Sequence, residues 1–209
     1  MAMDYSIIDS LPVLHFSADS QRELTTAFIR MAEFYESPYE NIRGKYFDLK
    51  IYKKLYAKDH GRFSYYTDWS GYNIPSNAIK KFKTIFGQEL TEKEQFILDS
   101  IEEVFGDINT RKNYYIIGTY KSNYTTSTFY HEISHSLFSL KRKYKAKCDE
   151  IYKKIPPSMK EKINKVLKEY GYSTTEYEDE TQAYFSTDRL SILLDRFHLK
   201  NEEALLEIV

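Results

Sequence analysis

The sequence is poor in cysteine, glycine and proline. Cys148 is the single cysteine among 209 residues, so the chain cannot form an intrachain disulfide or a four-cysteine metal site. Seven glycines and five prolines are too few for a collagen-like chain or a flexible linker sequence. A lone cysteine is typical of a reducing compartment, and we therefore predict a cytoplasmic protein.

An excess of one charge and long apolar runs are also missing. Lysine plus arginine total 30 and aspartate plus glutamate total 31, so the net charge of -1 lacks the large positive field of a dedicated nucleic-acid-binding protein. No uncharged apolar run approaches the roughly 18 residues that a membrane helix needs. Residues 1–16 contain neither the basic region nor the long apolar region of a secretory signal. We therefore expect neither nucleic acid nor a membrane as a partner.

Large aromatic side chains are abundant instead. The chain has 20 tyrosines and 13 phenylalanines, and we expect a core built of large rings. Hydrophobic residues make up 42% and charged residues 29%, which is ordinary for a globular protein and too apolar for a disordered one. The length of 209 residues favours a single domain spanning residues 1–209 over two small ones.

Apolar residues at three- and four-residue spacing predict amphipathic helices in the first half of the chain. These helices lie near residues 21–36, 47–55, 79–86 and 91–105. Thr91 and Glu94 have the spacing of a capping box at the start of the last of them. Aromatic and β-branched residues predict strands at 62–67 and 114–120, and turn-forming residues predict a loop over 68–75.

The second half is expected to be mostly helical. Ser158 with Glu161 and Thr175 with Glu178 have capping-box spacing and are predicted to begin two helices. Further C-terminal helices are predicted within residues 188–209. The balance of elements predicts an α+β fold, mainly helical with a small β-sheet.

The most informative segment carries the sequence His-Glu-Ile-Ser-His. On a helix, the side chains of His131 and His135 project from one face about 6 Å apart, so both imidazoles can reach one metal ion. Glu132 lies beside them and can hold and deprotonate a water molecule at the metal, which is the general-base role in zinc hydrolases. Two nitrogen ligands with a carboxylate and an open water position favour zinc, one ion per chain.

The opposite face of this helix is apolar and is predicted to be buried. Its members follow the 3.6-residue period and extend the helix past residue 140: Tyr130, Ile133, Leu137, Leu140 and Tyr144.

A catalytic zinc site needs a third protein ligand, and the residues at fixed distances after His135 exclude two known ligand patterns. One pattern places glycine and histidine three and six residues after the second histidine, where this chain has Phe138 and Lys141. Other patterns place glutamate about 19 or 20 residues after it, where this chain has Lys154 and Ile155. The third ligand must therefore lie elsewhere.

The remaining acidic cluster lies at residues 177–184. Glu180 shares a helix face with three residues whose side chains would surround a carboxylate with rings and a hydroxyl: Tyr177, Thr181 and Tyr184. A metal would balance a carboxylate buried there, which makes Glu180 the predicted ligand, with Glu178 and Asp179 as alternatives. The competing account is a solvated acidic helix start favoured by the helix dipole.

The HEISH sequence, followed at a distance by Glu180-Thr-Gln-Ala183, resembles the gluzincin branch of the zincin metallopeptidases. The resemblance covers about residues 112–187, and residues 1–110 match no family that we can name. It implies His131, His135 and Glu180 as zinc ligands and Glu132 as the catalytic base.

The resemblance also implies a fold and a function. The fold would have a zincin-like core of the two metal-binding helices and the preceding strand, whose edge pairs with an extended peptide. The function would be zinc-dependent hydrolysis of peptide bonds, with a peptide or protein substrate. The alternative is a non-catalytic zincin-like protein-binding module with a structural or vestigial metal site.

Two supporting roles stay open in the sequence. Tyr177, Tyr184 or His198 could stabilise the developing oxyanion. Asp179 or Asp188 could orient the first histidine, because relatives have an acidic residue where this chain has Tyr184. The sequence does not define the oligomeric state.

Overall fold

The computed structural model describes residues 3–8, 10–121 and 127–187. Contacts divide the chain into two compact units, residues 1–129 (unit 1) and residues 130–209 (unit 2). The helices outweigh the strands, which confirms the prediction of a mainly helical α+β protein with a small sheet. The prediction that both units form one domain stays a prediction.

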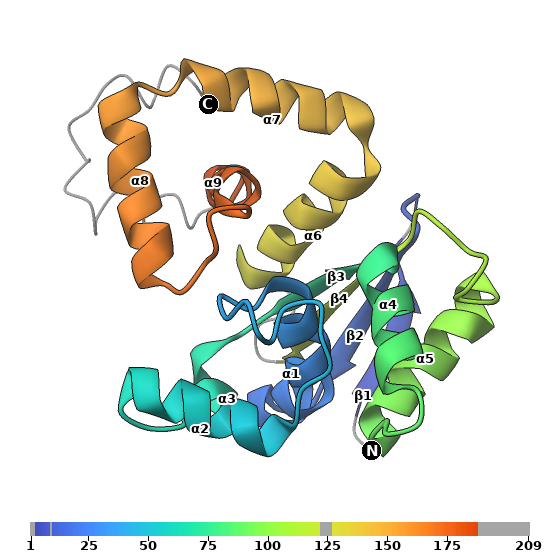
Figure 1. The fold of residues 1–209 in the computed structure, drawn as a ribbon. Coiled ribbons are helices and arrows are strands. Elements are labelled where there is room, and N and C mark those ends of the chain that lie inside the picture. Colours follow the sequence, from blue (N-terminus) through green and yellow to red (C-terminus); the bar gives the residue numbers. More distant parts are fainter. Residues whose placement is uncertain (1–2, 9, 122–126, 188–209) are drawn as a thin grey trace. The chain divides into compact units, whose positions relative to one another are not determined.

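Unit 1 contains a four-stranded sheet (Figure 1). Its strands are β1 (Met3–Ile7), β2 (Val13–Ala18), β3 (Tyr72–Pro75) and β4 (Tyr115–Tyr120), arranged in the order β1-β2-β4-β3. β2 and β4 run parallel, and each of them pairs antiparallel with the outer strand beside it. β4 therefore lies inside the sheet, and β1 and β3 form its edges.

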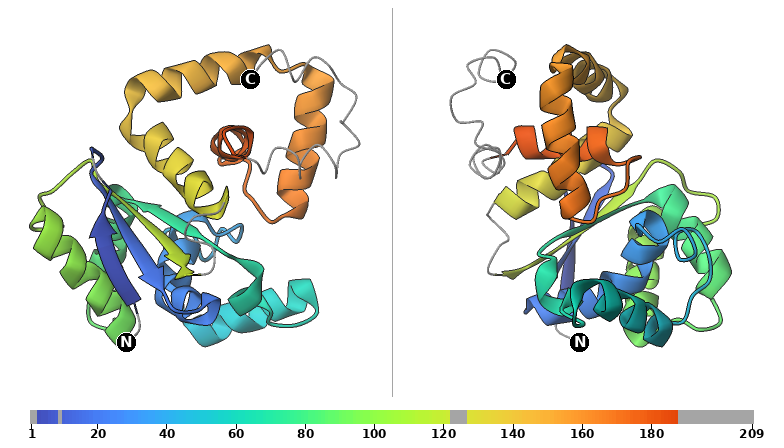
Figure 2. Two further views of the ribbon diagram at one scale, coloured as in Figure 1. Left: turned by 180° about the vertical axis from the view of Figure 1, so that it is seen from behind. Right: turned by 60° about the vertical axis from the view of Figure 1, so that its left-hand side comes forward.

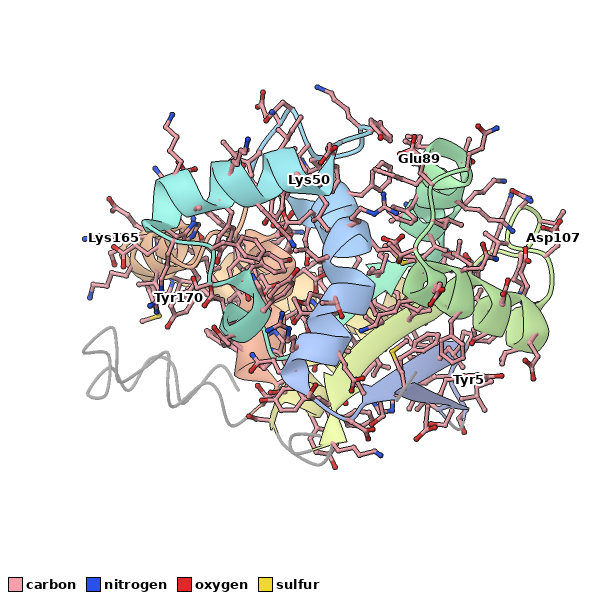
Figure 3. The ribbon with its side chains drawn as sticks, turned by 90° about the horizontal axis from the view of Figure 1, so that it is seen from below. Tyr5, Lys50, Glu89, Asp107, Lys165 and Tyr170 are labelled. Carbon is pink, nitrogen blue, oxygen red and sulfur yellow. The ribbon has the colours of Figure 1, made fainter. Side chains whose placement is uncertain are left out.

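Helices cover one face of this sheet and share its hydrophobic core. They are α1 (Gln21–Glu36), α2 (Leu49–His60), α3 (Tyr65–Asp68), α4 (Ser76–Phe86) and α5 (Glu92–Phe105). Figure 3 shows α1 in front of the strands, with Tyr5 of β1 beside α5, where its hydroxyl donates to Glu103 at 2.8 Å. The close approach of α1 requires a glycine in β4, because a Cβ atom at Gly118 would lie 2.9 Å from the side chains of Leu24 and Phe28.

Local sequence signals account for two of these helices. Ser20 caps α1, accepting a hydrogen bond from the backbone N–H of Glu23, and the helix spans the predicted residues 21–36. Thr91 and Glu94 form the predicted capping box of α5, since each side chain accepts a hydrogen bond from the other's backbone N–H.

The prediction of a strand at 62–67 is wrong, because this stretch leads into α3. Tyr65 is buried, and its ring lies 5.8 Å from Tyr52 and 5.2 Å from Tyr56. Packing against α2 therefore overrides the β-propensity of the aromatic residues. The predicted loop over 68–75 is also partly wrong, because its last four residues form β3.

β3 also corrects the expectation that the edge of β4 pairs with an extended peptide. The strand predicted at 114–120 is confirmed, but β3 pairs with one side of it and β2 with the other. β4 therefore cannot offer a free edge to an extended peptide.

Unit 2 is helical in its described part. Its elements are α6 (Ser127–Leu140, which begins in unit 1), α7 (Arg142–Lys154), α8 (Pro157–Glu169) and α9 (Tyr177–Phe185). In Figure 1 α9 is seen end-on and enclosed by α6, α7 and α8, and the view from behind in Figure 2 agrees. A second hydrophobic core joins α8 and α9 through Ile155, Met159, Ile163, Leu167, Tyr177 and Tyr184.

Neither predicted capping box of unit 2 forms. Pro157 occupies the first turn of α8, so the helix starts before Ser158 can cap it. The hydroxyl of Thr175 lies 2.7 Å from that of Ser173, and no side chain caps α9. Instead, Glu176 accepts hydrogen bonds from the backbone N–H and the hydroxyl of Ser173, at 2.9 and 2.8 Å, and closes the turn before α9.

The predicted C-terminal helices lie outside the described residues, as do Asp188 and His198. Within the described part of the chain, no helix is long and apolar enough to cross a membrane.

Candidate metal centre

The two histidines of the HEISH sequence lie one turn apart on α6. His131 and His135 are 3% and 2% exposed, and their rings are nearly perpendicular, with centroids 4.8 Å apart. Their Nε2 atoms are 3.2 Å apart. Both imidazoles therefore point one nitrogen toward the same small volume.

The histidine face of α6 is its buried face, which corrects the prediction of a buried apolar back face. Tyr130 is 59% exposed, and Ile133, Leu137 and Leu140 are only partly buried, whereas Glu132 is 5% exposed. α6 also ends at Leu140, so Tyr144 belongs to α7. The 3.6-residue period identifies two faces of a helix but not which of them the rest of the protein covers.

Glu180 of α9 completes the group. Its Oε2 atom lies 3.5 Å from His131 Nε2, and its Oε1 atom lies 3.4 Å from His135 Nε2. As the sequence predicts, the face of α9 that carries Glu180 is buried, together with Tyr177, Thr181 and Tyr184. Within the described part of the chain, these two histidines and Glu180 form the group of potential ligand atoms that lie within 4.8 Å of one another.

The spacing of these atoms fits a tetrahedral metal site. Ligand atoms bound to zinc at about 2.1 Å with tetrahedral angles are about 3.4 Å apart. The two Nε2 atoms are 3.2 Å apart, and they lie 3.5 and 3.4 Å from two different oxygens of the Glu180 carboxylate. The donor set of two imidazoles and one carboxylate is also one that catalytic zinc sites use, so the residues fit the metal that the sequence predicts.

The two alternative ligands have other partners. Asp179 Oδ1 lies 2.9 Å from His135 Nδ1, on the side of the ring away from Glu180. Glu178 interacts with Asp149 of α7, and burial and this neighbouring carboxylate raise the pKa of Glu178. The structure therefore brings Glu180, and neither alternative, to the two Nε2 atoms.

Asp179 orients the second histidine, whereas the sequence suggested it for the first. Because a carboxylate only accepts hydrogen bonds, Nδ1 of His135 is the donor in this contact. The Nε2 lone pair of a neutral His135 then faces Glu180 and His131, which is the arrangement of a carboxylate–histidine–metal triad. His131 packs instead against Tyr184, with ring centroids 4.8 Å apart.

The acidic surroundings control the protonation of His135 in the metal-free protein. Burial lowers its pKa, but the charges of Asp179 and Glu180, the hydrogen bond to Asp179 and the charge of Glu132 outweigh burial. The pKa of His135 is therefore raised well above 6.5. A proton on this histidine balances the carboxylates in the absence of a metal cation.

Tyr172 is a site residue that the sequence did not indicate. Its hydroxyl lies 3.5 Å from that of Tyr184. Burial raises the pKa of Tyr172 well above 10, and the charges of Glu180 and Glu132 raise it further. Tyr172 lies in the turn between α8 and α9, where no periodic pattern marks a residue that points toward the site.

Comparisons with protein-family models, with curated proteins and with solved structures find no match to this chain.

Proposed function

We propose that unit 2 binds one zinc ion through His131, His135 and Glu180 and hydrolyses peptide bonds, with Glu132 as the general base. The observation that carries the proposal is a buried group in which the two histidine Nε2 atoms are 3.2 Å apart and each lies 3.4 to 3.5 Å from one oxygen of the Glu180 carboxylate. On this proposal, α6 and α9 are a zincin-like pair of metal-binding helices, and the lone cysteine fits a cytoplasmic location.

The acidic excess of the group supports a cation as its natural partner. Burying several carboxylates together is unfavourable unless protons or cations balance them. The raised pKa of His135 has this origin, since the charges of Asp179 and Glu180 favour a positive neighbour. A divalent cation supplies that charge without a proton and leaves both imidazoles neutral, as metal ligation requires.

Each residue has a separate role in the proposed reaction. When bound, zinc would lower the pKa of a water molecule and polarise the peptide carbonyl. Glu132 accepts the proton of the attacking water and delivers it to the leaving amine as the C–N bond breaks. Tyr172 or Tyr184 donates a hydrogen bond to the developing oxyanion, and the raised pKa of Tyr172 keeps its hydroxyl protonated for this role.

Metal content is the first test. Elemental mass spectrometry of the purified, zinc-reconstituted protein should give one zinc per chain, and His131→Ala and Glu180→Gln should lose it. Glu178→Gln is the matched control, because it makes the same change on the same helix away from the two Nε2 atoms, and it should keep the zinc. A wild-type protein without zinc would refute the proposal.

Hydrolysis is the second test. A quenched-fluorescence peptide library should report cleavage by the zinc-loaded wild type, and Glu132→Gln should keep zinc but lose about 10²- to 10⁴-fold in rate. Zinc binding without cleavage that depends on Glu132 would favour the non-catalytic module. In that case chelation should unfold unit 2, because a structural zinc site contributes directly to folding.

A further inference from the structure

A chain of hydrogen-bonded side chains runs from α7 to Nδ1 of His135, the ring nitrogen that does not face the other potential ligand atoms. The hydroxyl of Tyr144 donates to Gln182 Oε1 at 2.9 Å, and Gln182 Nε2 donates to Asp179 Oδ1 at 2.8 Å. The same Oδ1 atom is 2.9 Å from His135 Nδ1. Tyr144, Gln182 and Asp179 are called the relay below.

We propose that Gln182 and Tyr144 are positioning residues for the metal site, which hold Asp179 and through it the ring of His135. The inference rests on the proposed zinc site and adds two residues that do not touch the metal. It makes α7 part of the site, although α7 supplies none of the three ligands.

The hydrogen bonds of the relay allow only one assignment of donors and acceptors. Gln182 Oε1 can only accept, so Tyr144 is the donor, and the amide nitrogen can only donate to the carboxylate. Asp179 Oδ1 then accepts both from Gln182 and from His135. This arrangement requires a proton on Nδ1 of His135 and directs Nε2 of the neutral ring to the other two ligand atoms.

Asp179 needs such support because its side chain is not enclosed. It is 24% exposed, whereas that of His135 is 2% exposed. Without the amide of Gln182, the carboxylate could rotate toward water and release the histidine ring. Gln182 is itself buried at 8% exposure, and both ends of its amide are satisfied by the relay, so its rotamer is held from two sides.

Tyr144 and Gln182, at the outer end of the relay, line a cavity of about 190 Å³ between α7 and α9. Its wall combines apolar side chains, among them Ile151 and Phe185, with the polar side chains of Glu178 and Ser186. Hydrogen bonds in such a setting are stronger than in water, and an unmade one costs more. The loss of one hydrogen bond of the relay should therefore weaken the next one.

Zinc affinity measures the effect directly. Loss of a hydrogen-bonding partner behind a ligand typically lowers metal affinity by 10- to 100-fold. Gln182→Met keeps the length of the side chain but removes its donor, and we expect about a 10- to 100-fold higher zinc Kd in competition with a chromophoric chelator. Tyr144→Phe acts one link further away and should raise Kd by about 3- to 10-fold.

A second readout separates positioning from general stability. With Co²⁺ in place of Zn²⁺, the visible absorption bands report ligand geometry, and both variants should shift or broaden them. Tyr152→Phe is the matched control, since Tyr152 lines the same cavity from the same helix and is not part of the relay. It should leave the zinc Kd and the cobalt spectrum unchanged.

The outcomes distinguish this inference from the proposed function. Wild-type zinc binding with an unchanged Kd in Gln182→Met and Tyr144→Phe would overturn the positioning role alone. An equal loss of zinc affinity in Tyr152→Phe would overturn the positioning role as well, because that variant changes the cavity wall without touching the relay. If Gln182→Met does not fold, Tyr144→Phe by itself decides the question, and a wild type that binds no zinc overturns both proposals.

Discussion

The two units balance their buried charges with different chemistry. In unit 1 the carboxylate of Glu94 accepts hydrogen bonds from the guanidinium of Arg30, one of them at 2.7 Å, and the two side chains are 2% and 9% exposed. In unit 2 the buried carboxylate of Glu180 faces two histidines. Arginine carries its charge at every accessible pH, whereas histidine carries one only when protonated. The pair in unit 1 is complete by itself, and the group in unit 2 needs a proton or a metal.

Two buried histidines show the same contrast. His15 of β2 is 1% exposed and lies 2.8 Å from the hydroxyl of Thr119, and burial lowers its pKa to about 4. His135 is equally buried, but the carboxylates around it raise its pKa well above 6.5. Burial alone therefore does not set the protonation of a histidine, because nearby charges can reverse its effect.

The largest effect should come from breaking the pair in unit 1. Arg30→Met leaves Glu94 buried without its cation, and we expect the free energy of unfolding to fall by about 3–5 kcal/mol in denaturant titrations. The partly exposed pair of Lys83 and Glu102 offers a control, since Lys83→Met should cost less than about 1 kcal/mol. Similar losses in both variants would mean that the burial of the Arg30–Glu94 pair does not raise the cost of breaking it.

A double variant sharpens this prediction. Arg30→Met/Glu94→Gln removes both charges but keeps a residue at position 94 that can serve the capping box with Thr91. It should recover much of the stability lost in Arg30→Met, because no unpaired charge remains buried.

The next effect concerns pH and should have opposite signs in the two units. The pKa of His15 is lower in the folded state than in the unfolded state, so its contribution is present above pH 6.5 and is lost as pH falls from about 6.5 toward about 4. The pKa of His135 is raised, so its contribution is present below pH 6.5 and is lost as pH rises through its folded pKa. Each proton changes the free energy of unfolding by up to about 1.4 kcal/mol per pH unit.

Unfolding of the metal-free protein in EDTA between about pH 5 and pH 9 measures both contributions. His15→Gln should be less sensitive on the acid side, and Asp179→Asn less sensitive on the alkaline side. A wild-type protein whose two histidines titrate together near pH 6.5 by NMR would show that the two environments do not differ as described.

The smallest effect compares helix starts in the two units. Thr91→Ala removes an observed cap of α5 and should cost about 1 kcal/mol. Ser158→Ala changes a residue that has the same sequence spacing but caps nothing, and it should stay within about 0.5 kcal/mol. Equal costs in denaturant titrations would mean that Ser158 caps α8 after all.

The capping boxes explain where sequence reasoning succeeded and where it failed. The box at Thr91 forms because the apolar period of α5 starts immediately after it. The same spacing at Ser158 and Thr175 does not give capping boxes. Pro157 lies in the first turn of α8 ahead of Ser158, and the hydroxyl of Thr175 interacts with that of Ser173. A rule based only on the spacing of two residues does not include the effects of the residues beside them.

The sequence prediction is also wrong for elements whose packing partners lie outside the local stretch of chain. Tyr65 favours a strand by propensity but lies in α3, where it packs on tyrosines of α2. Residues 72–75 look like part of a loop but pair with β4, about forty residues further along the chain. In both cases contacts outside the local window decided the structure.

Local spacing along the chain is enough to define one part of the site. The i and i+4 spacing of His131 and His135 places both rings on one face of a helix, because the helical repeat fixes that geometry whatever the surroundings. The face that Glu180 shares with its aromatic neighbours already favours it as the third ligand, but the contact of Asp179 with His135 and the place of Tyr172 beside Tyr184 come from the tertiary structure. These contacts join residues that are far apart in the chain or lie outside any periodic pattern, and they depend on how the helices of unit 2 pack around α9.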